Sequence, residues 1–201
     1  MSITERRERQ KQATKDGILS AARQIARAEG WGAVTVRRVA ELVDYTPPII
    51  YQYFAGKDAL LEELQRQGFL LLADGMRQAV AETEDAHARL LRMGQAYWRF
   101  AREQPELYQI MDDIGSVRVP LDATLAGATL VGDIVQNHLE EWALSRRVTL
   151  PDPAGAVETL WGLLHGLVSA QMLGRIGGGE ERAEQLTMQA VEDLLFAWSR
   201  R

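Results

Sequence analysis

The chain has 201 residues, of which 46% are hydrophobic and 25% charged, a balance typical of a globular protein rather than of a disordered or fibrous one. The absence of cysteine excludes disulfide scaffolds, thiol nucleophiles, zinc ribbons and iron–sulfur ligation. The charged residues 1–11 are followed by no apolar segment, so we expect no secretion signal and a cytoplasmic protein.

Charge is distributed unevenly along the chain. Residues 1–57 contain ten Lys and Arg against six Asp and Glu, whereas the remainder contains 13 against 22. A polyanionic partner would therefore meet the first quarter of the chain and be repelled by the rest. The alternative is a chance imbalance, because the difference is small.

Helical periodicity dominates the first 80 residues. Apolar side chains in residues 18–26 form one face of a first helix, which Gly30 closes as a left-handed cap. The basic residues before it, Arg6 to Lys15, form either a solvated, frayed tail or an arm that follows a neighbouring groove or backbone of a nucleic acid.

A second, short helix and a tight turn come next. Thr35 is its N-cap, and apolar residues repeat at i, i+3, i+4 and i+7 over residues 36–43. Asp44 and Tyr45 form the turn, because Asp tolerates the left-handed conformation.

A third short helix starts at residues 46–48, since proline is accepted in a first helical turn, and runs through Phe54. Pro48 disfavours helical geometry at Pro47, so Pro48 is an alternative start. Lys57 opens a long fourth helix that reaches Val80.

The rest of the chain is also predicted to be helical, which makes the fold class all-α. Residues 115–120 form the clearest interior loop, and Gly177–Gly179 separate the last two helices. The most apolar segment is interrupted by polar residues, so we expect no membrane span. The predicted helices cover residues 86–103, 105–113, 121–147, 154–176 and 181–200.

One longer helix followed by two short helices joined by a tight turn is the arrangement of a helix-turn-helix domain, which places the second helix of the pair in the DNA major groove. Tyr51 and Tyr53 flank Gln52 on that helix. Lys57 begins the next helix, where its amine and the helix N–H groups can bind a phosphate together. The sequence therefore predicts double-stranded DNA as a partner.

Three segments, residues 30–40, 51–54 and 57–61, resemble the DNA-binding domain of TetR-type transcriptional regulators. The resemblance covers residues 12–65. It implies a homodimer with a helix-turn-helix domain in residues 1–65, of which residues 1–11 are a basic arm. It also implies an effector-binding and dimerisation domain in residues 66–201. The family usually has glycine where this chain has Asp44, and the double proline removes two backbone donors and a cationic side chain from the recognition helix.

We expect DNA contacts from side chains of the two short helices and their flanks. Gln52 can form a bidentate pair with adenine, whereas Pro47 and Ile49 can contact a thymine methyl group. The alternatives are helix capping for the threonines, packing for the tyrosines and a solvated face for Arg38. The predicted DNA-binding residues are Thr35, Arg37, Thr46, Pro47, Ile49, Tyr51, Gln52, Tyr53 and Lys57.

Small residues at i+4 spacing form a smooth stripe in the predicted helix 154–176, which would let another backbone approach closely. Together with the amphipathic last helix, this stripe predicts a four-helix dimer interface. The predicted dimerisation residues are Gly162, Gly166, Ala170, Gly174, Leu194 and Trp198.

Trp161 and His165 lie one turn apart and, with the glycine that follows, resemble the signature of a TetR subgroup named for Trp, His and Gly. They would line a pocket for a small apolar or amphipathic effector, because ligand cavities usually have aromatic walls and few polar groups. The alternative for His165 is a core histidine satisfied by a neighbour. The predicted effector-binding residues are Tyr97, Trp98, Tyr108, Met111, Trp161 and His165.

No constellation favours an enzyme, a metal site or a cofactor. The adjacent acidic pairs point to different helix faces, and the three histidines lack chelating spacing. The sequence favours a ligand-responsive repressor that binds a pseudo-palindromic operator as a dimer. An activator with the same DNA domain, or an all-α dimeric ligand-binding adaptor without specific DNA binding, remain alternatives.

Overall fold

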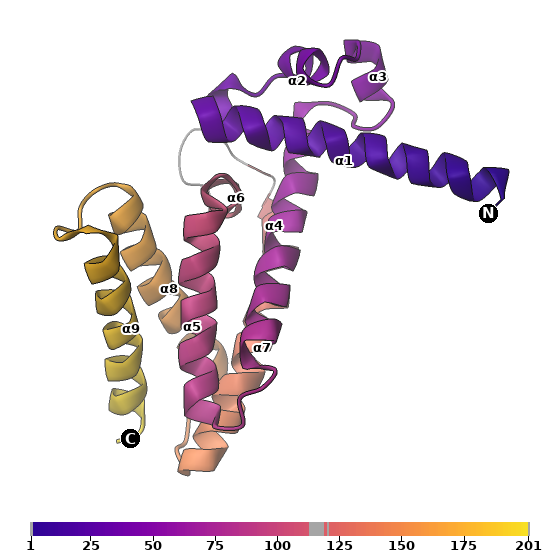
Figure 1. Cartoon of the computed structure of the whole chain (residues 1–201). Coiled ribbons are helices and arrows are strands. Elements are labelled where there is room, and N and C mark those ends of the chain that lie inside the picture. Colours follow the sequence, from indigo (N-terminus) through magenta and orange to yellow (C-terminus); the bar gives the residue numbers. More distant parts are fainter. Residues whose placement is uncertain (1, 113–118, 120, 201) are drawn as a thin grey trace. The chain divides into compact units, whose positions relative to one another are not determined.

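The computed structural model describes residues 2–112, 119 and 121–200 of the chain, and the side chains of these residues except 121–123. The described residues form α-helices and one short 3-10 helix, without a strand (Figure 1), which confirms the all-α class. Within this part of the chain, no helix is both long and apolar enough to cross a membrane.

The chain divides into two compact units. Unit 1 combines residues 1–68 with residues 105–124, and unit 2 combines residues 69–104 with residues 125–201. The first boundary lies close to the expected one at residue 65. The difference is that residues 105–124, expected to belong to the second domain, pack with the helix-turn-helix segment.

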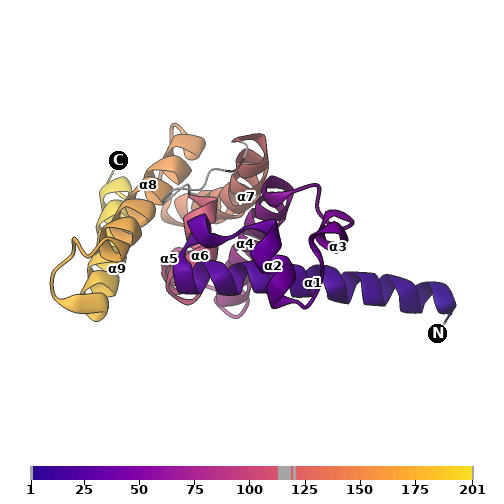
Figure 2. The same ribbon diagram turned by 90° about the horizontal axis from the view of Figure 1, so that it is seen from above.

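Unit 1 contains the helices of the predicted DNA-binding domain and one later helix. Figure 2 shows α2 and α3 beside α1, and α4 continues from unit 1 into unit 2. The elements are α1 (Ile3–Glu29), η1 (Trp31–Ala33), α2 (Val36–Leu42), α3 (Pro47–Tyr51), α4 (Lys57–Val80) and α6 (Pro105–Met111).

Helix α1 begins at Ile3, so the prediction of a frayed tail for the basic residues is wrong. Ser2 and Glu5 form a capping box: the Ser2 hydroxyl accepts from the Glu5 N–H at 3.1 Å, and the Ser2 N–H donates to the Glu5 carboxylate at 2.8 Å. Gly30 ends the helix at φ 82° and ψ 163°, outside the expected left-handed region but in one essentially restricted to glycine.

Helix α3 is shorter than predicted. It begins at Pro47 rather than Pro48 and ends at Tyr51 rather than Phe54. The Phe54 N–H still donates to the Ile50 carbonyl at 3.0 Å, which closes a turn after the helix. Phe54 and Ile50 are buried, and this packing decides where the turn stops.

Helix α6 is held in unit 1 by polar contacts with α1 and η1. The buried Glu106 carboxylate accepts from Arg23 Nη2 at 2.7 Å and from Arg27 Nη2 at 2.9 Å. The Trp31 indole N–H donates to the Glu106 carbonyl at 2.9 Å. These contacts span 75 or more positions along the chain, so periodicity could not predict them.

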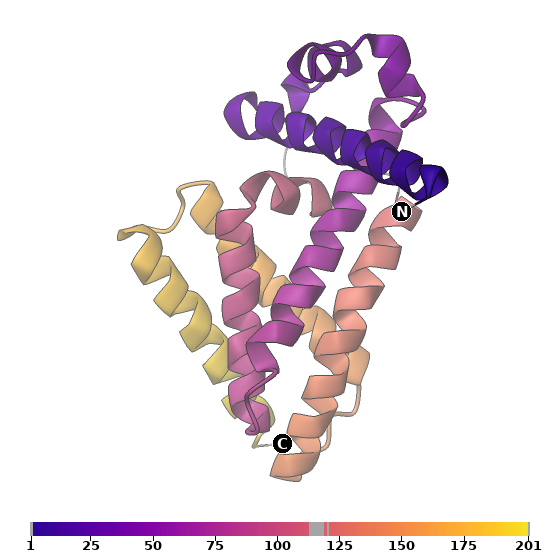
Figure 3. The ribbon, with the colours of Figure 1, turned by 45° about the vertical axis from the view of Figure 1, so that its right-hand side comes forward.

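Unit 2 contains the second half of α4 and four further helices. Figure 3 shows α5, α8 and α9 side by side, and these three helices pack against each other. Residues 113–118 and 120, which include most of the predicted interior loop, lie outside the described residues. The elements are α5 (Ala86–Glu103), α7 (Leu121–Arg146), α8 (Pro153–Met172) and α9 (Gly179–Trp198).

Candidate nucleic-acid interface

The turn between α2 and α3 has the geometry expected of a helix-turn-helix. Asp44 adopts φ 55°, and the Tyr45 N–H donates to the Ala40 carbonyl at 2.9 Å. The Thr35 hydroxyl accepts from the Arg38 N–H at 3.2 Å, which confirms Thr35 as the N-cap of α2. Thr35 therefore sets where α2 begins, and Asp44 supplies the positive φ of the turn that follows it.

Polar side chains at the two ends of α3 are exposed on unit 1. Thr46 has N-cap backbone geometry but makes no side-chain cap, so the helix does not use its hydroxyl. Thr35, Arg37, Thr46, Tyr51 and Gln52 are exposed, and Pro47, Ile49, Tyr53 and Lys57 are half-buried. None of the nine predicted residues is fully buried.

Two of the predicted cationic contacts have partners within unit 1. Arg37 Nε lies 2.9 Å from Glu41 Oε1, and the Arg37 side chain is 85% exposed. Exposed ion pairs of this kind are worth about 0–1 kcal/mol, so the guanidinium can exchange this partner for a phosphate. Lys57 Nζ donates to the Trp31 carbonyl at 3.3 Å, which holds the first turn of α4 against η1.

Arg38 joins α2 to the end of α1. Its Nη1 donates to Glu29 Oε2 at 2.8 Å. The hydrogen bond lowers the pKa of Glu29 and raises the pKa of Arg38. Arg38 lies on a partly exposed face, as expected, and its guanidinium is paired there with a carboxylate of α1.

Tyr45 was not among the predicted contacts, yet it is 41% exposed in the turn between α2 and α3. Leu42, at the end of α2, is also exposed. The sequence signal for Tyr45 is that it is an aromatic residue in a tight turn and does not belong to the apolar periodicity of the preceding helix. We add Tyr45 to the candidate interface, because its hydroxyl is a hydrogen-bond donor beside the N-terminus of α3.

The predicted effector residues do not all lie in one unit. Tyr97 and Trp98 are buried in α5 of unit 2, and the Trp98 indole N–H has no hydrogen-bond partner. Tyr108 and Met111 are buried in α6 of unit 1. Trp161, by contrast, is 49% exposed on α8, and its role as an effector contact stays a prediction.

Trp161 and His165 instead stack on the outer face of α8. Their ring centroids are 5.0 Å apart and the ring planes are inclined by 15°. His165 is half-buried, its Nε2 lies 3.4 Å from Ser169 Oγ, and desolvation lowers its pKa. His165 is thus less buried than the alternative of a core histidine expects, although it has a neighbouring hydroxyl, and its role as an effector contact stays a prediction.

The predicted dimerisation residues are only partly on this outer face. Gly162 and Gly166 are exposed there, and a methyl group added at either position would meet no other atom within 4 Å. Gly174 lies beyond the end of α8 at φ 65°, so it terminates the helix rather than extending the stripe. Trp198 is buried in unit 2 itself, and its place as an interface residue is a misassignment.

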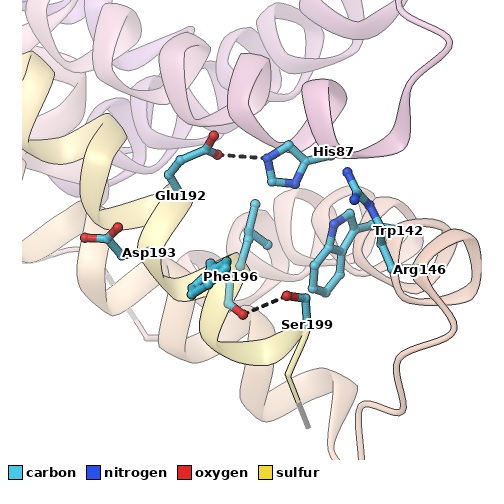
Figure 4. Close-up of a pocket in the computed structure, with 8 residues that line it drawn as sticks. His87, Trp142, Arg146, Glu192, Asp193, Phe196 and Ser199 are labelled. Atoms are coloured by element: carbon cyan, nitrogen blue, oxygen red, sulfur yellow. Dashed lines mark hydrogen bonds and ion pairs between the residues drawn. The ribbon is translucent and has the colours of Figure 1, made fainter.

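Unit 2 has a cavity of about 470 Å³ formed by the first turn of α5 and the last turns of α7 and α9. Figure 4 shows His87 and Glu192 paired on one side, with Nε2 and Oε2 2.8 Å apart, and Trp142 and Phe196 across from them. None of the six predicted effector residues lines this cavity. It is lined by His87, Trp142, Arg146, Glu192, Asp193, Leu195, Phe196 and Ser199.

Comparison with known families accounts for both halves of the chain. Residues 18–64 match the model of bacterial regulatory proteins of the tetR family. Residues 90–194, more than half of the chain, match the model of the tetracyclin repressor-like C-terminal domain. The chain belongs to the TetR family.

Relatives of this TetR-family chain share its fold more than its sequence. It is 32% identical over 96 residues to the uncharacterized HTH-type transcriptional regulator YobS of Bacillus subtilis (strain 168), a match that spans 48% of this chain and 50% of that relative. The chain thus spans about half the length of this curated relative.

Two solved structures resemble the chain over nearly its whole length. A protein of unknown function from Rhodococcus sp. RHA1 has a TM-score of 0.81 at 19% identity, covering 92% of this chain and 95% of its own. A TetR family transcription regulator from Marinobacter aquaeolei VT8 has a TM-score of 0.71 at 19% identity, covering 93% and 97%. At these identities the likeness concerns the TetR fold. The resemblance to the Trp-His-Gly subgroup stays a prediction.

Proposed function

We propose that this TetR-family chain is a ligand-responsive repressor that binds a pseudo-palindromic DNA operator as a homodimer in the cytoplasm. The observation that carries the proposal is the short helix α3, which follows a tight turn, is flanked by the exposed Thr46 and Gln52, and precedes a lysine at the N-terminus of α4. A short helix in these surroundings fits the major groove of B-DNA.

Side chains on and around α3 have the chemistry for both kinds of DNA contact. Gln52 is exposed and can form a bidentate pair with adenine, and half-buried Ile49 can contact a thymine methyl group. Pro47 is proposed to contact the bases. The residues proposed to contact phosphates are Thr35, Arg37, Thr46, Tyr51, Tyr53 and Lys57. These contacts would position the helix without reading sequence.

The outer face of α8 is proposed as the dimer interface. Gly162 and Gly166 are exposed and unobstructed, and half-buried Ala170 continues their row. A row of small residues lets two helices approach closely, while Trp161 beside it supplies apolar area. On α9, half-buried Leu194 and exposed Phe196 add further apolar surface.

Unit 2 is proposed to bind the effector. A volume of about 470 Å³ lies in the usual range for ligand pockets, and the cavity sets the aromatic rings of Trp142 and Phe196 among five polar or charged side chains. Tyr97 and Trp98 remain candidate contacts in the interior of the same unit. An effector can release DNA only if it binds the DNA-competent and the DNA-free arrangements of the dimer with different affinity.

The proposal is tested by selecting duplexes from a random DNA library at moderate salt without added ligand. We expect the wild type to recover an inverted repeat, Tyr53→Phe to enrich it less strongly, and Gln52→Ala to recover it with relaxed preference at one position of each half-site. Glu82→Gln, an exposed substitution after the end of α4, serves as the control and should retain the repeat.

Two outcomes of this selection would overturn the proposal. Recovery of only sequence-independent, salt-labile duplexes would leave no operator to recognise. Recovery of no duplex at all would instead support a dimeric adaptor that binds a ligand in unit 2. A reporter gene placed behind the recovered repeat then separates repression from activation.

A further inference from the structure

The first turns of α1 extend beyond the part of the chain that matches the family model. That match starts at residue 18, whereas α1 starts at Ile3. Residues 2–13 are all exposed, so these turns pack on nothing within unit 1. The capping box of Ser2 and Glu5 nevertheless holds them in helical form from the first residue.

Charge is segregated around this part of α1. An α-helix advances by about 100° per residue, so residues three, four and seven positions apart share a side. Arg6, Arg7 and Lys11 lie on one side, which we call the basic face, together with Gln10. The opposite side contains Glu5, Glu8, Gln12 and Asp16, at spacings of three, four and four.

Later residues of α1 show where these two sides point within unit 1. Arg23 and Arg27 follow Asp16 at spacings of seven and eleven, and both bind Glu106 of α6. The acidic side of α1 is therefore the side that α6 occupies further along the helix. The basic face continues into Ile18 and Ile25, which are buried.

Figures 1 and 3 show α2 and α3 on one side of α1 and α6 on the other. The basic face thus lies on the same side of α1 as the helix-turn-helix pair. Two of the three acidic groups on the other side have partners within α1 or its cap, since Glu5 accepts from the Ser2 N–H and Asp16 accepts from Gln12 Nε2 at 2.8 Å. In the described part of the chain, the structure gives Arg6, Arg7 and Lys11 no ion pair.

We propose that the basic face of α1 binds the phosphate backbone of the DNA that flanks the site contacted by α3. This inference rests on the proposed function, because it requires that unit 1 binds DNA. A preformed helix with cationic side chains on one side loses little conformational freedom on binding a polyanion. Contacts of this kind add affinity and lengthen the bound site without reading bases.

The test measures operator affinity as a function of salt for the full-length dimer, using the repeat recovered by selection in a duplex with long flanks. The triple variant Arg6→Gln, Arg7→Gln, Lys11→Gln should flatten the log–log slope by about 0.9 for each lost phosphate contact. Its preference among operator sequences should be unchanged. Gln is a good helix former, so circular dichroism should show α1 intact.

Single variants provide a matched control. Arg7→Gln and Arg9→Gln remove the same charge from one turn of α1, but Arg9 lies off the basic face, toward the acidic side. We expect Arg7→Gln to flatten the slope and Arg9→Gln to leave it close to that of the wild type. Shortening the flanks of the duplex should weaken the wild type and leave the triple variant unaffected.

Equal slopes for the wild type and the triple variant on the recovered repeat would overturn the basic-face proposal while leaving the proposed function intact. Equal effects of Arg7→Gln and Arg9→Gln on the slope would show that α1 acts only through its net charge. This result would also overturn the basic-face proposal. Failure of the wild type to select any repeat concerns the proposed function itself, so the two failures are distinguishable.

Discussion

Arg27 and Glu106 lie 79 positions apart in the chain, yet Arg27 Nη2 donates to Glu106 Oε2 at 2.9 Å. Arg23 donates to the same carboxylate, and the side chain of Glu106 is 2% exposed. One buried carboxylate thus connects two turns of α1 to the start of α6. This connection explains why α6 belongs to the unit of the helix-turn-helix.

Replacing Glu106 by Gln should destabilise unit 1. The amide has one acceptor oxygen instead of two and no negative charge to balance the two guanidinium groups, although both groups can still reach water, so we expect a loss of about 1–3 kcal/mol in the free energy of unfolding. Urea denaturation measures this loss. Glu8→Gln removes the same charge from an exposed site and should change stability by less than about 0.5 kcal/mol. Equal stability of the two variants would contradict the role of Glu106.

Acidification should weaken the contact between α1 and α4 through Glu63. Hydrogen bonds from Arg66 at 2.8 Å and Lys15 at 3.2 Å lower the pKa of Glu63. The unfolded chain therefore takes up this proton at a higher pH than the folded chain, and the stabilisation is lost as pH falls through the lowered pKa.

The measurement compares the wild type with Glu63→Gln by urea denaturation from about pH 6 to about pH 3, across the ordinary pKa of a Glu. The wild type should lose more stability than the variant over this interval. Parallel curves for the two proteins would show that Glu63 is not held in its ionised form by the fold.

His165 should make stability depend on pH in a higher range. Desolvation lowers its pKa, so the folded chain favours the neutral imidazole. Stability is then fully present above the unfolded pKa of about 6.5 and falls as pH drops below it. A His165→Gln variant should lack this loss when both proteins are titrated from about pH 8 to about pH 5. A larger loss in the variant would contradict the assignment.

Gly166→Leu should prevent dimerisation without harming the protomer. A methyl group at position 166 meets no atom within 4 Å, and leucine is a better helix former than glycine by about 0.5–1 kcal/mol. The added side chain would instead block the close approach of a second α8. Sedimentation equilibrium should show a shift from dimer to monomer.

Gly75 offers a matched control for that substitution, because it lies in α4 and also has no atom within 4 Å of an added methyl group. Gly75→Leu should leave the dimer unchanged. A dimeric Gly166→Leu protein would place the interface elsewhere.

Gln52→Ala should relax base preference at one position of each half-site. A bidentate contact between an amide and adenine contributes about 1–3 kcal/mol of discrimination against the wrong base, and alanine retains none of it. Competition binding among operator variants measures this discrimination. Uniform weakening at every position would indicate that Gln52 contacts a phosphate.

Local features of unit 1 were determined by the sequence itself. Thr35 as the cap of α2 and Asp44 in the turn follow from side-chain chemistry within a few residues, and the fold class follows from helical periodicity. The start of α1 at Ile3 was also available, because Ser2 and Glu5 have the spacing of a capping box. Interactions at such short range can be predicted without knowing which segments of the chain pack together.

Only the tertiary structure decided which helix faces are covered. The sequence placed Trp161 in a pocket, yet α8 turns it outward because Leu160 and Leu164 occupy the buried side of the same helix. Trp198 was expected on the surface and lies in the core, and Glu106 joins α6 to α1 across 79 to 83 positions. Burial depends on which segments meet in space, and an amphipathic pattern shows that a face is covered without showing by which partner.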